Sequence, residues 1–182
     1  MALLLKKTVV LVGMMGAGKT AVGKAVAAKL DVPFLDSDEE IVRAANMNIP
    51  EIFERDGEPF FREKERQVIT RLLEEERGIL STGGGAFMSD KNREIIEEKG
   101  MALWLRVDLD LLWQRVRHKN TRPLLQTDNP LQTLTDIYNQ RVPIYENAAL
   151  VVDAKPEYSI EDMADAVIAA LQAKPEVLET TI

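Results

Sequence analysis

The stretch that decides the fold is residues 8–20, Thr-Val-Val-Leu-Val-Gly-Met-Met-Gly-Ala-Gly-Lys-Thr. Its first five residues are apolar or β-branched, which predicts a buried strand. The other eight fit the pattern G-x-x-x-x-G-K-[ST], whose glycines let the backbone approach a phosphate while successive N–H groups surround it. Residues 18–30 continue with apolar positions at helical spacing. A strand that runs through such a motif into a helix predicts a phosphate-binding loop (P-loop) for a nucleotide.

The P-loop residues have separate expected roles. We expect Lys19 to reach the β- and γ-phosphates of ATP, and the Thr20 hydroxyl to be a ligand of one Mg²⁺ ion. The alternative is a glycine-rich turn without a ligand, and the flanking strand and helix argue against it. The nucleotide-binding residues predicted from this motif are Gly16, Ala17, Gly18, Lys19, Thr20 and Ala21.

Composition excludes several classes of function. The 182 residues fit one domain, and a net charge of −7 argues against a general nucleic-acid binder, which needs a basic face. The absence of cysteine excludes disulfides, thiolate metal sites and a thiol nucleophile, and it favours the reducing cytoplasm. Lys6 and Lys7 interrupt the apolar start, so we interpret it as part of a first strand and not as a signal peptide. No stretch approaches the roughly 20 apolar residues of a membrane span.

Short apolar runs alternate with longer amphipathic segments along the chain, which predicts an α/β fold with a parallel sheet. We expect a single domain over residues 1–173, with a five-stranded parallel sheet flanked by helices, and a flexible tail over residues 174–182. Residues 118–130 have little periodicity, and we interpret them as a mobile lid loop. The predicted strands are residues 8–12, 33–35, 78–81, 101–107 and 150–152.

Two carboxylates follow the second predicted strand. Asp36 and Asp38 stand at its end, and parallel strands deliver such ends to the edge of the sheet where ligands bind. One carboxylate could orient Mg²⁺ while the other accepts a hydrogen bond from an acceptor hydroxyl. The alternative is that Asp38 only supports the N-terminus of the next helix. We expect Ser37 to be the N-cap of that helix, with Glu40 completing a capping box.

Three successive glycines, residues 83–85, follow the third predicted strand. Glycine costs chain entropy on folding, so a run of three suggests that the backbone approaches a ligand closely. The alternative is a flexible turn.

Five segments together resemble the shikimate kinase family, and the resemblance covers residues 8 to about 172. They occur in the family's order behind the P-loop, and together they are more specific than any one of them alone. The segments are Asp36-Ser37-Asp38, the F-R-x-x-E pattern of Phe61–Glu65, Thr82–Gly85, Thr121–Leu125, and the R-x-P-x-Y pattern of Arg141–Tyr145.

The resemblance implies a small-molecule kinase that transfers the γ-phosphate of ATP to the 3-hydroxyl of shikimate, in chorismate and aromatic amino-acid biosynthesis. It implies that Mg²⁺ is required and that Thr20 and Asp36 are its protein ligands. In this reading Arg122 closes over the phosphates as part of the lid, where positive charge meets the oxygens of the transferring group. The catalytic residues that the resemblance implies are Lys19, Asp38 and Arg122.

The resemblance also implies a substrate site. Arg62 and Arg141 converge on the shikimate carboxylate, which a guanidinium can bind through two parallel hydrogen bonds. Glu65 either holds Arg62 in place or contacts a substrate hydroxyl. Arg115 stacks on adenine, and residues 152–156 loosely resemble the adenine-contacting loop. The implied substrate-binding residues are Asp38, Arg62, Gly83, Gly84, which donates its N–H, Gly85 and Arg141, and the nucleotide contacts outside the P-loop are Arg115 and Arg122.

Two other functions remain to be weighed. A gluconate-type or nucleoside-monophosphate kinase shares a P-loop and a lid, but Asp-Ser-Asp together with F-R-x-x-E favours a polyhydroxylated carboxylate as acceptor. A regulatory P-loop switch should carry an acidic end on the third strand and an N-K-x-D motif, whereas that strand ends in Thr-Gly-Gly-Gly and the sequence contains no N-K-x-D. We expect a monomer whose partners are shikimate and ATP, with no nucleic acid or membrane as a partner.

Overall fold

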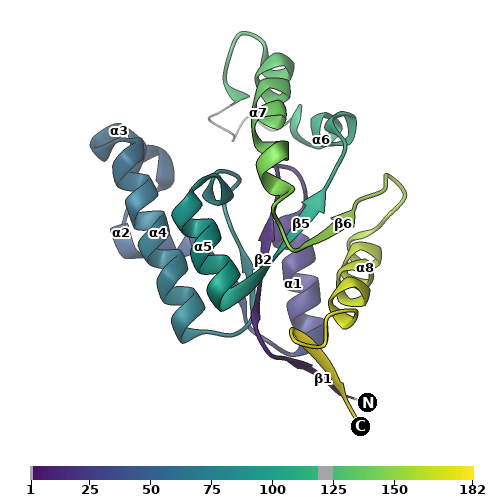
Figure 1. The fold of residues 1–182 in the computed structure, drawn as a ribbon. Helices are drawn as coiled ribbons and strands as arrows, with labels where there is room; N and C mark the ends of the chain where they lie inside the picture. Colours follow the sequence, from purple (N-terminus) through teal and green to yellow (C-terminus); the bar gives the residue numbers. More distant parts are fainter. Residues whose placement is uncertain (1, 119–124) are drawn as a thin grey trace.

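Five parallel strands form the central sheet of the computed structural model, which describes residues 2–118 and 125–182 (Figure 1). This sheet and its helices confirm the predicted α/β fold. The middle strand is the one that opens the P-loop motif, and all five of its residues are buried. In spatial order the strands are β3 (Phe34–Asp36), β4 (Ile79–Ser81), β2 (Thr8–Val12), β5 (Gly100–Arg106) and β6 (Leu150–Asp153). The P-loop therefore leaves the sheet at the centre of its carboxyl edge.

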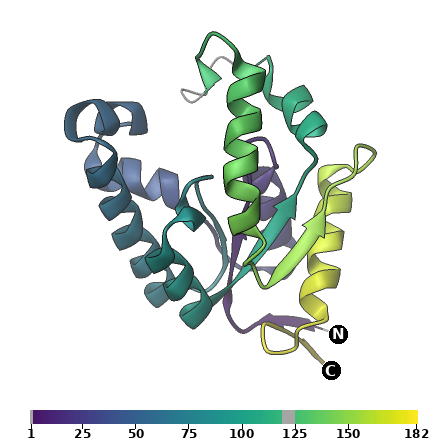
Figure 2. The same cartoon turned by 45° about the horizontal axis from the view of Figure 1, so that its top comes forward.

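Helices cover both faces of this sheet (Figures 1 and 2). α1 and α8 pack against each other on one face, while α4 and α5 pack together on the other, with α5 against β5. α2 and α3 pack on α4, away from the sheet. In the part of the chain that the structure describes, no helix has both the length and the apolar character needed to cross a bilayer. The helices are α1 (Lys19–Leu30), α2 (Ser37–Ala45), α3 (Ile49–Asp56), α4 (Glu58–Glu75), α5 (Asp90–Lys99), α6 (Leu109–Val116), α7 (Pro130–Tyr145), α8 (Ile160–Gln172) and the short 3₁₀ helix η1 (Ala86–Met88).

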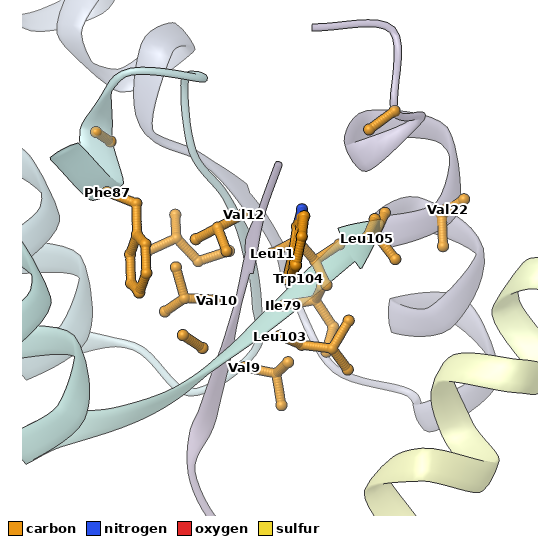
Figure 3. Packing of buried hydrophobic residues seen from close by; sticks show 14 of the residues in the cluster. Val9, Val10, Leu11, Val12, Val22, Ile79, Phe87, Leu103, Trp104 and Leu105 are labelled. Carbon is orange, nitrogen blue, oxygen red and sulfur yellow. The ribbon is translucent and has the colours of Figure 1, made fainter. Parts of the chain in front are cut away.

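The hydrophobic core lies on both sides of β2, because successive side chains of a strand point to opposite faces. Figure 3 shows Val10 and Val12 on the same side of β2 as Phe87, while Val22 of α1 lies on the other side. Trp104 of β5 is 3% exposed, so core packing accounts for this tryptophan as the buried fourth strand predicts. A strand that is apolar at every position fits a sheet that is covered on both faces.

The expected flexible tail is wrong. Residues 178–181 form strand β7 (Leu178–Thr181), which pairs antiparallel with β1 (Ala2–Leu5) in a separate two-stranded sheet. Val177 and Leu178 are buried, at 0% and 1% exposed. The tail appeared frayed in sequence because its pairing partner stands at the other end of the chain, where no local pattern can reveal it.

The expected cap of α2 is also wrong. The N-cap is Asp36, whose Oδ1 accepts the backbone N–H of Asp38 at 2.9 Å and of Glu39 at 3.2 Å. Ser37 is instead the first helical residue, because β3 runs one residue further than expected and α2 follows it without a connecting loop. The prediction of a lid covers residues 118–130, of which residues 119–124 lie outside the described residues.

Candidate active site

The P-loop backbone has the conformations that its glycines predict. Gly16 and Gly18 have φ angles of 84° and 93°, in the left-handed region that favours glycine. A Cβ atom on Gly16 would also lie 2.7 Å from Cγ1 of Val116, so α6 leaves no room for a side chain there. Gly18 is the N-cap of α1, and the loop therefore ends with backbone N–H groups and the positive end of a helix dipole at the same point.

Two cationic side chains donate hydrogen bonds to backbone carbonyls of the P-loop. Lys19 Nζ donates to the backbone carbonyls of Gly13 and Met14 at 2.7 and 2.9 Å. Arg115 of α6 donates through Nη1 to the carbonyl of Gly16 at 3.0 Å, and burial lowers the pKa of its guanidinium. Arg115 therefore supports the loop directly, and its stacking on adenine stays a prediction.

One cavity of about 610 Å³ connects the P-loop with the ends of β3 and β4. Its lining includes every residue that the motif predicts as a nucleotide contact, together with both carboxylates of the Asp-Ser-Asp segment and part of the glycine run. The lining residues are Met15, Gly16, Ala17, Gly18, Lys19, Thr20, Ala21, Val22, Asp36, Asp38, Ser81, Thr82, Gly83, Gly84, Arg115, Tyr158, Ser159, Ile160 and Met163. Residues from five separate segments of the chain thus line one open cavity.

Asp38 is a buried carboxylate at the edge of the cavity. Its Oδ1 is buried, and among the described residues it has no hydrogen-bond partner. Burial first, and then the negative charge of Asp36, raise the pKa of Asp38 to about 6, against the opposing influence of Lys19 and Arg62. Asp36 caps α2 and Asp38 lies in the first turn of that helix, so the charge of Asp38 is also near the positive end of the helix dipole, and its role in binding the acceptor stays a prediction.

The glycine run brings the two predicted substrate arginines to one place. A Cβ atom built on Gly84 would lie 2.7 Å from Nη1 of Arg141, and one built on Gly85 would lie 2.5 Å from Nη2 of Arg62. A Cβ atom on Gly83 would lie 3.0 Å from Oδ1 of Asp38. Three consecutive glycines therefore allow three polar side chains from β3–α2, α4 and α7 to touch the same backbone segment.

Glu65 holds Arg62 in place, as the first of its two expected roles has it. Arg62 donates through Nη1 to Oε1 of Glu65 at 2.9 Å, and the two residues lie three apart on α4. Glu65 is 1% exposed, and burial raises the pKa of its carboxyl while the charge of Arg62 lowers it. The buried carboxylate fixes a guanidinium that is itself one-third exposed.

Sequence reasoning missed one wall of the cavity. Tyr158, Ser159, Ile160 and Met163 line it from the start of α8, beyond the expected adenine loop of residues 152–156. Ser159 forms a capping box with Asp162, in which the backbone N–H of Asp162 donates to Oγ of Ser159 at an N···O distance of 3.0 Å. The S-x-x-D pattern was the available signal, since it places the start of a helix at the carboxyl edge of the last strand. Arg122, an expected catalytic and nucleotide-binding residue, lies outside the described residues.

A P-loop lies at the centre of the parallel sheet, and two arginines lie against the glycine run at the edge of the same cavity. These features define a class of proteins: P-loop enzymes that use a nucleotide and a second, anionic small molecule. Comparison with known proteins makes this specific. The family model described as shikimate kinase matches residues 15–172.

Individual relatives agree with the family model. A shikimate kinase of Ruegeria pomeroyi is 62% identical over 175 residues, which cover 96% of this chain and 90% of that protein. One of Cereibacter sphaeroides is 62% identical over 176 residues, covering 97% of this chain and 88% of that protein. The solved structure of shikimate kinase from Acinetobacter baumannii in complex with shikimate has a TM-score of 0.86 and 38% identity, over 92% of this chain and 93% of that one. The chain belongs to the shikimate kinase family.

Proposed function

We propose that this site transfers the γ-phosphate of ATP to the 3-hydroxyl of shikimate, with the residue roles given below. The chain is an ATP-dependent kinase that acts on shikimate, and this reaction is a step of aromatic amino-acid biosynthesis. The observation that carries the division of roles is the shared cavity: it joins the P-loop to Asp38 and the glycine run, where Arg62 and Arg141 meet.

The nucleotide half of the site is the P-loop, residues 16–21. Its N–H groups and the N-terminus of α1 surround phosphate oxygens, and Lys19 neutralises charge on the β- and γ-phosphates. Thr20 and Asp36 line the same cavity, and their hydroxyl and carboxylate oxygens are the hard donors that Mg²⁺ prefers, so they fit the expected metal. When bound, Mg²⁺ supplies further positive charge to the phosphates.

The acceptor half binds shikimate through its carboxylate and its hydroxyls. Arg62 and Arg141 each offer a guanidinium fork to the carboxylate, and Glu65 fixes the first of them. The backbone N–H groups of Gly84 and Gly85, for which the described residues provide no hydrogen-bond acceptor, are donors for the same anion. Asp38 accepts a hydrogen bond from the reacting hydroxyl with its unpartnered Oδ1.

In the transfer step, the 3-hydroxyl oxygen forms a bond to the γ-phosphorus as the bond from that phosphorus to the β,γ-bridging oxygen breaks. ADP leaves with the bridging oxygen, and Asp38 accepts the hydroxyl proton. The transition state of such a transfer is loose, so most of the catalysis is positioning and charge neutralisation. A pKa of about 6 makes Asp38 a better proton acceptor than an ordinary aspartate while leaving it ionised at neutral pH. The contribution of Arg122 stays a prediction.

Substituting the two arginines tests this division of roles. Arg62→Ala and Arg141→Ala should each raise the KM for shikimate by roughly 30- to 100-fold, the loss expected for a charge-assisted pair of hydrogen bonds, and leave the KM for ATP within about twofold. Steady-state kinetics with each substrate varied measures both values. The matched control is Arg71→Ala on α4, where the guanidinium contacts Glu40 outside the site, and it should change neither KM.

An equal rise in both KM values would contradict the separation of the two halves. Turnover assays with shikimate, gluconate and nucleoside monophosphates identify the acceptor, because the Asp38 and arginine set suits a hydroxylated carboxylate. Appreciable turnover of a monophosphate would contradict the assignment. A monomer and a cytoplasmic location are part of the proposal, and sedimentation and cell fractionation measure them.

A further inference from the structure

Tyr145, the last residue of α7, connects the core of the protein to the glycine run. Its side chain is 0% exposed, and its ring packs with Trp104 and Phe87 at centroid distances of 5.8 and 6.5 Å. The hydroxyl donates a hydrogen bond of 2.5 Å to the backbone carbonyl of Gly84, 61 residues away in the sequence. A buried aromatic side chain thus donates a hydrogen bond to a peptide group of the glycine run beside the proposed acceptor site.

This hydrogen bond fixes the orientation of a peptide group. The peptide between Gly84 and Gly85 is planar and trans, so its N–H points away from its carbonyl. Because the carbonyl is held toward Tyr145 in the core, the Gly85 N–H is directed to the other side of the segment. Within residues 2–118 and 125–182, no hydrogen bond is donated by the N–H of Gly84 or Gly85. Both N–H groups therefore remain as donors for a ligand.

Tyr145 also acts on Arg141. The two residues are four apart on α7 and share a helix face. Burial raises the pKa of the Tyr145 hydroxyl to about 12, although the positive charge of Arg141 and the proximity of its side chain act to lower that pKa. The hydroxyl therefore keeps its proton and can donate to Gly84 throughout the pH range in which enzymes work. The hydroxyl that donates to the Gly84 carbonyl is thus close enough to the Arg141 side chain to interact with it, and the guanidinium of Arg141 itself lies against Gly84.

We propose that Tyr145 is a positioning residue for the substrate carboxylate: its hydroxyl holds the Gly84 carbonyl and Arg141 in one arrangement, so that the carboxylate meets donors that are already in place. The effect follows from preorganisation, because donors that need no rearrangement lose less entropy when the ligand binds. This inference rests on the proposed function, which puts the carboxylate of shikimate at Arg141.

The test is the pair Tyr145→Phe and Tyr138→Phe. Tyr145→Phe removes one hydroxyl and keeps the ring that packs on Trp104. Tyr138→Phe makes the same change on the same helix, at a tyrosine that does not donate the hydrogen bond to Gly84. Tyr145→Phe should raise the KM for shikimate about tenfold, the effect of one hydrogen bond, with the KM for ATP and kcat within about twofold. Tyr138→Phe should change none of the three.

A second substrate separates positioning from a general loss of stability. The carboxamide of shikimate keeps the hydroxyls and lacks the anionic charge, so the ratio of its kcat/KM to that of shikimate measures recognition of the carboxylate. Tyr145→Phe should bring this ratio several-fold closer to one. An unchanged shikimate KM, or a loss that is equal for the acid and its carboxamide, would overturn the proposal.

Two further results complete the design. If Tyr145→Phe yields no folded protein, incorporation of 3-fluorotyrosine at position 145 keeps the ring and hydroxyl but changes the strength of the donor. The KM for shikimate should then change by at least about twofold while the KM for ATP stays constant. An unchanged KM for shikimate would overturn the proposal. Failure of the proposed function is distinguishable, because Arg141→Ala would then leave the shikimate KM unaltered whatever Tyr145 does.

Discussion

Glycine is favoured at positions 84 and 85 by the side chains packed against them more than by the backbone conformation. Neither has a positive φ angle, in contrast to Gly16 and Gly18 of the P-loop. What excludes a side chain at these two positions is the guanidinium group that lies against each α-carbon. A guanidinium is the end of a flexible side chain and can move aside, so an added methyl group should displace the arginine and leave the fold intact.

Gly85→Ala therefore should raise the KM for shikimate by about tenfold or more, because it displaces Nη2 of Arg62, while the free energy of unfolding changes by less than about 1 kcal/mol. The contrasting variant is Gly100→Ala, whose Cβ would lie 2.7 Å from the backbone carbonyl oxygen of Thr8 in the sheet. That variant should lose roughly 1–3 kcal/mol of stability, since backbone atoms cannot move aside, with the KM values little altered. Urea unfolding and steady-state kinetics on both proteins check the pair, and a Gly85→Ala that unfolds as easily as Gly100→Ala would contradict the argument.

The carboxyl of Asp38 is kept in an environment that does not favour its charge. Burial and Asp36 raise its pKa from 3.8 to about 6. The folded state therefore binds this proton more tightly than the unfolded chain does. The stability associated with it is fully present below pH 3.8 and is lost as the pH rises to about 6. The ionised form of Asp38 that the proposed phosphoryl transfer needs is thus the form that folding disfavours.

Asp38→Asn should accordingly stabilise the protein above pH 6, by at most about 3 kcal/mol, while its kinase activity is lost. The gain should be mostly gone near pH 4, where the wild-type carboxyl is protonated in the folded state and close to half protonated in the unfolded chain. For the wild-type enzyme, kcat/KM should fall about tenfold per pH unit below pH 6, because only the ionised Asp38 accepts the hydroxyl proton. Urea unfolding at pH 4 and pH 8 and a pH–rate profile test this, and a stability gain of equal size at both pH values would count against it.

At the scale of elements, the sequence predicts those strands and helices whose signals are local. The run from Thr8 to Val12 is uniformly apolar and became the central strand, and Gly57 interrupts the charged helical sequence where α3 gives way to α4. Ser37 was misjudged because two residues of the Asp-Ser-Asp segment can cap a helix and the choice depends on where β3 ends. β7 was missed because its partner, β1, is about 175 residues away in the sequence.

The β1–β7 pair should contribute to stability and not to catalysis. Leu178 is 1% exposed, so Leu178→Ala should lower the free energy of unfolding by about 2–4 kcal/mol through lost burial and the remaining cavity. The exposed neighbour Glu179, 3.8 Å from Lys6, provides a control, and Glu179→Ala should cost less than about 1 kcal/mol. Thermal unfolding and kinetics measure both effects. If Leu178→Ala unfolds like the wild type, the result would support the flexible tail that the sequence suggests for residues 174–182 and contradict a stabilising β1–β7 pair.

At the scale of the whole molecule, an acidic protein recognises anions by concentrating a few cations. The chain has 30 acidic and 23 basic residues, yet four cations stand at the cavity or beside the glycine run at its edge. They are Lys19, Arg62, Arg115 and Arg141. The family motifs located each of these residues in advance. What the motifs could not give is the set of contacts that hold them, such as the carbonyl of Gly16 for Arg115, because those contacts join segments that are distant in sequence.

The pairing of β1 with β7 also brings the two ends of the chain together, and Figure 1 shows them side by side at the pole of the molecule remote from α6 and α7. Ala2 stands opposite Thr181 in that pairing. A few added residues would suffice to splice the ends into a ring, and such a ring could be reopened at a surface turn without separating any pair of strands. The architecture that binds the two substrates should therefore not depend on the order in which its segments follow one another along the chain.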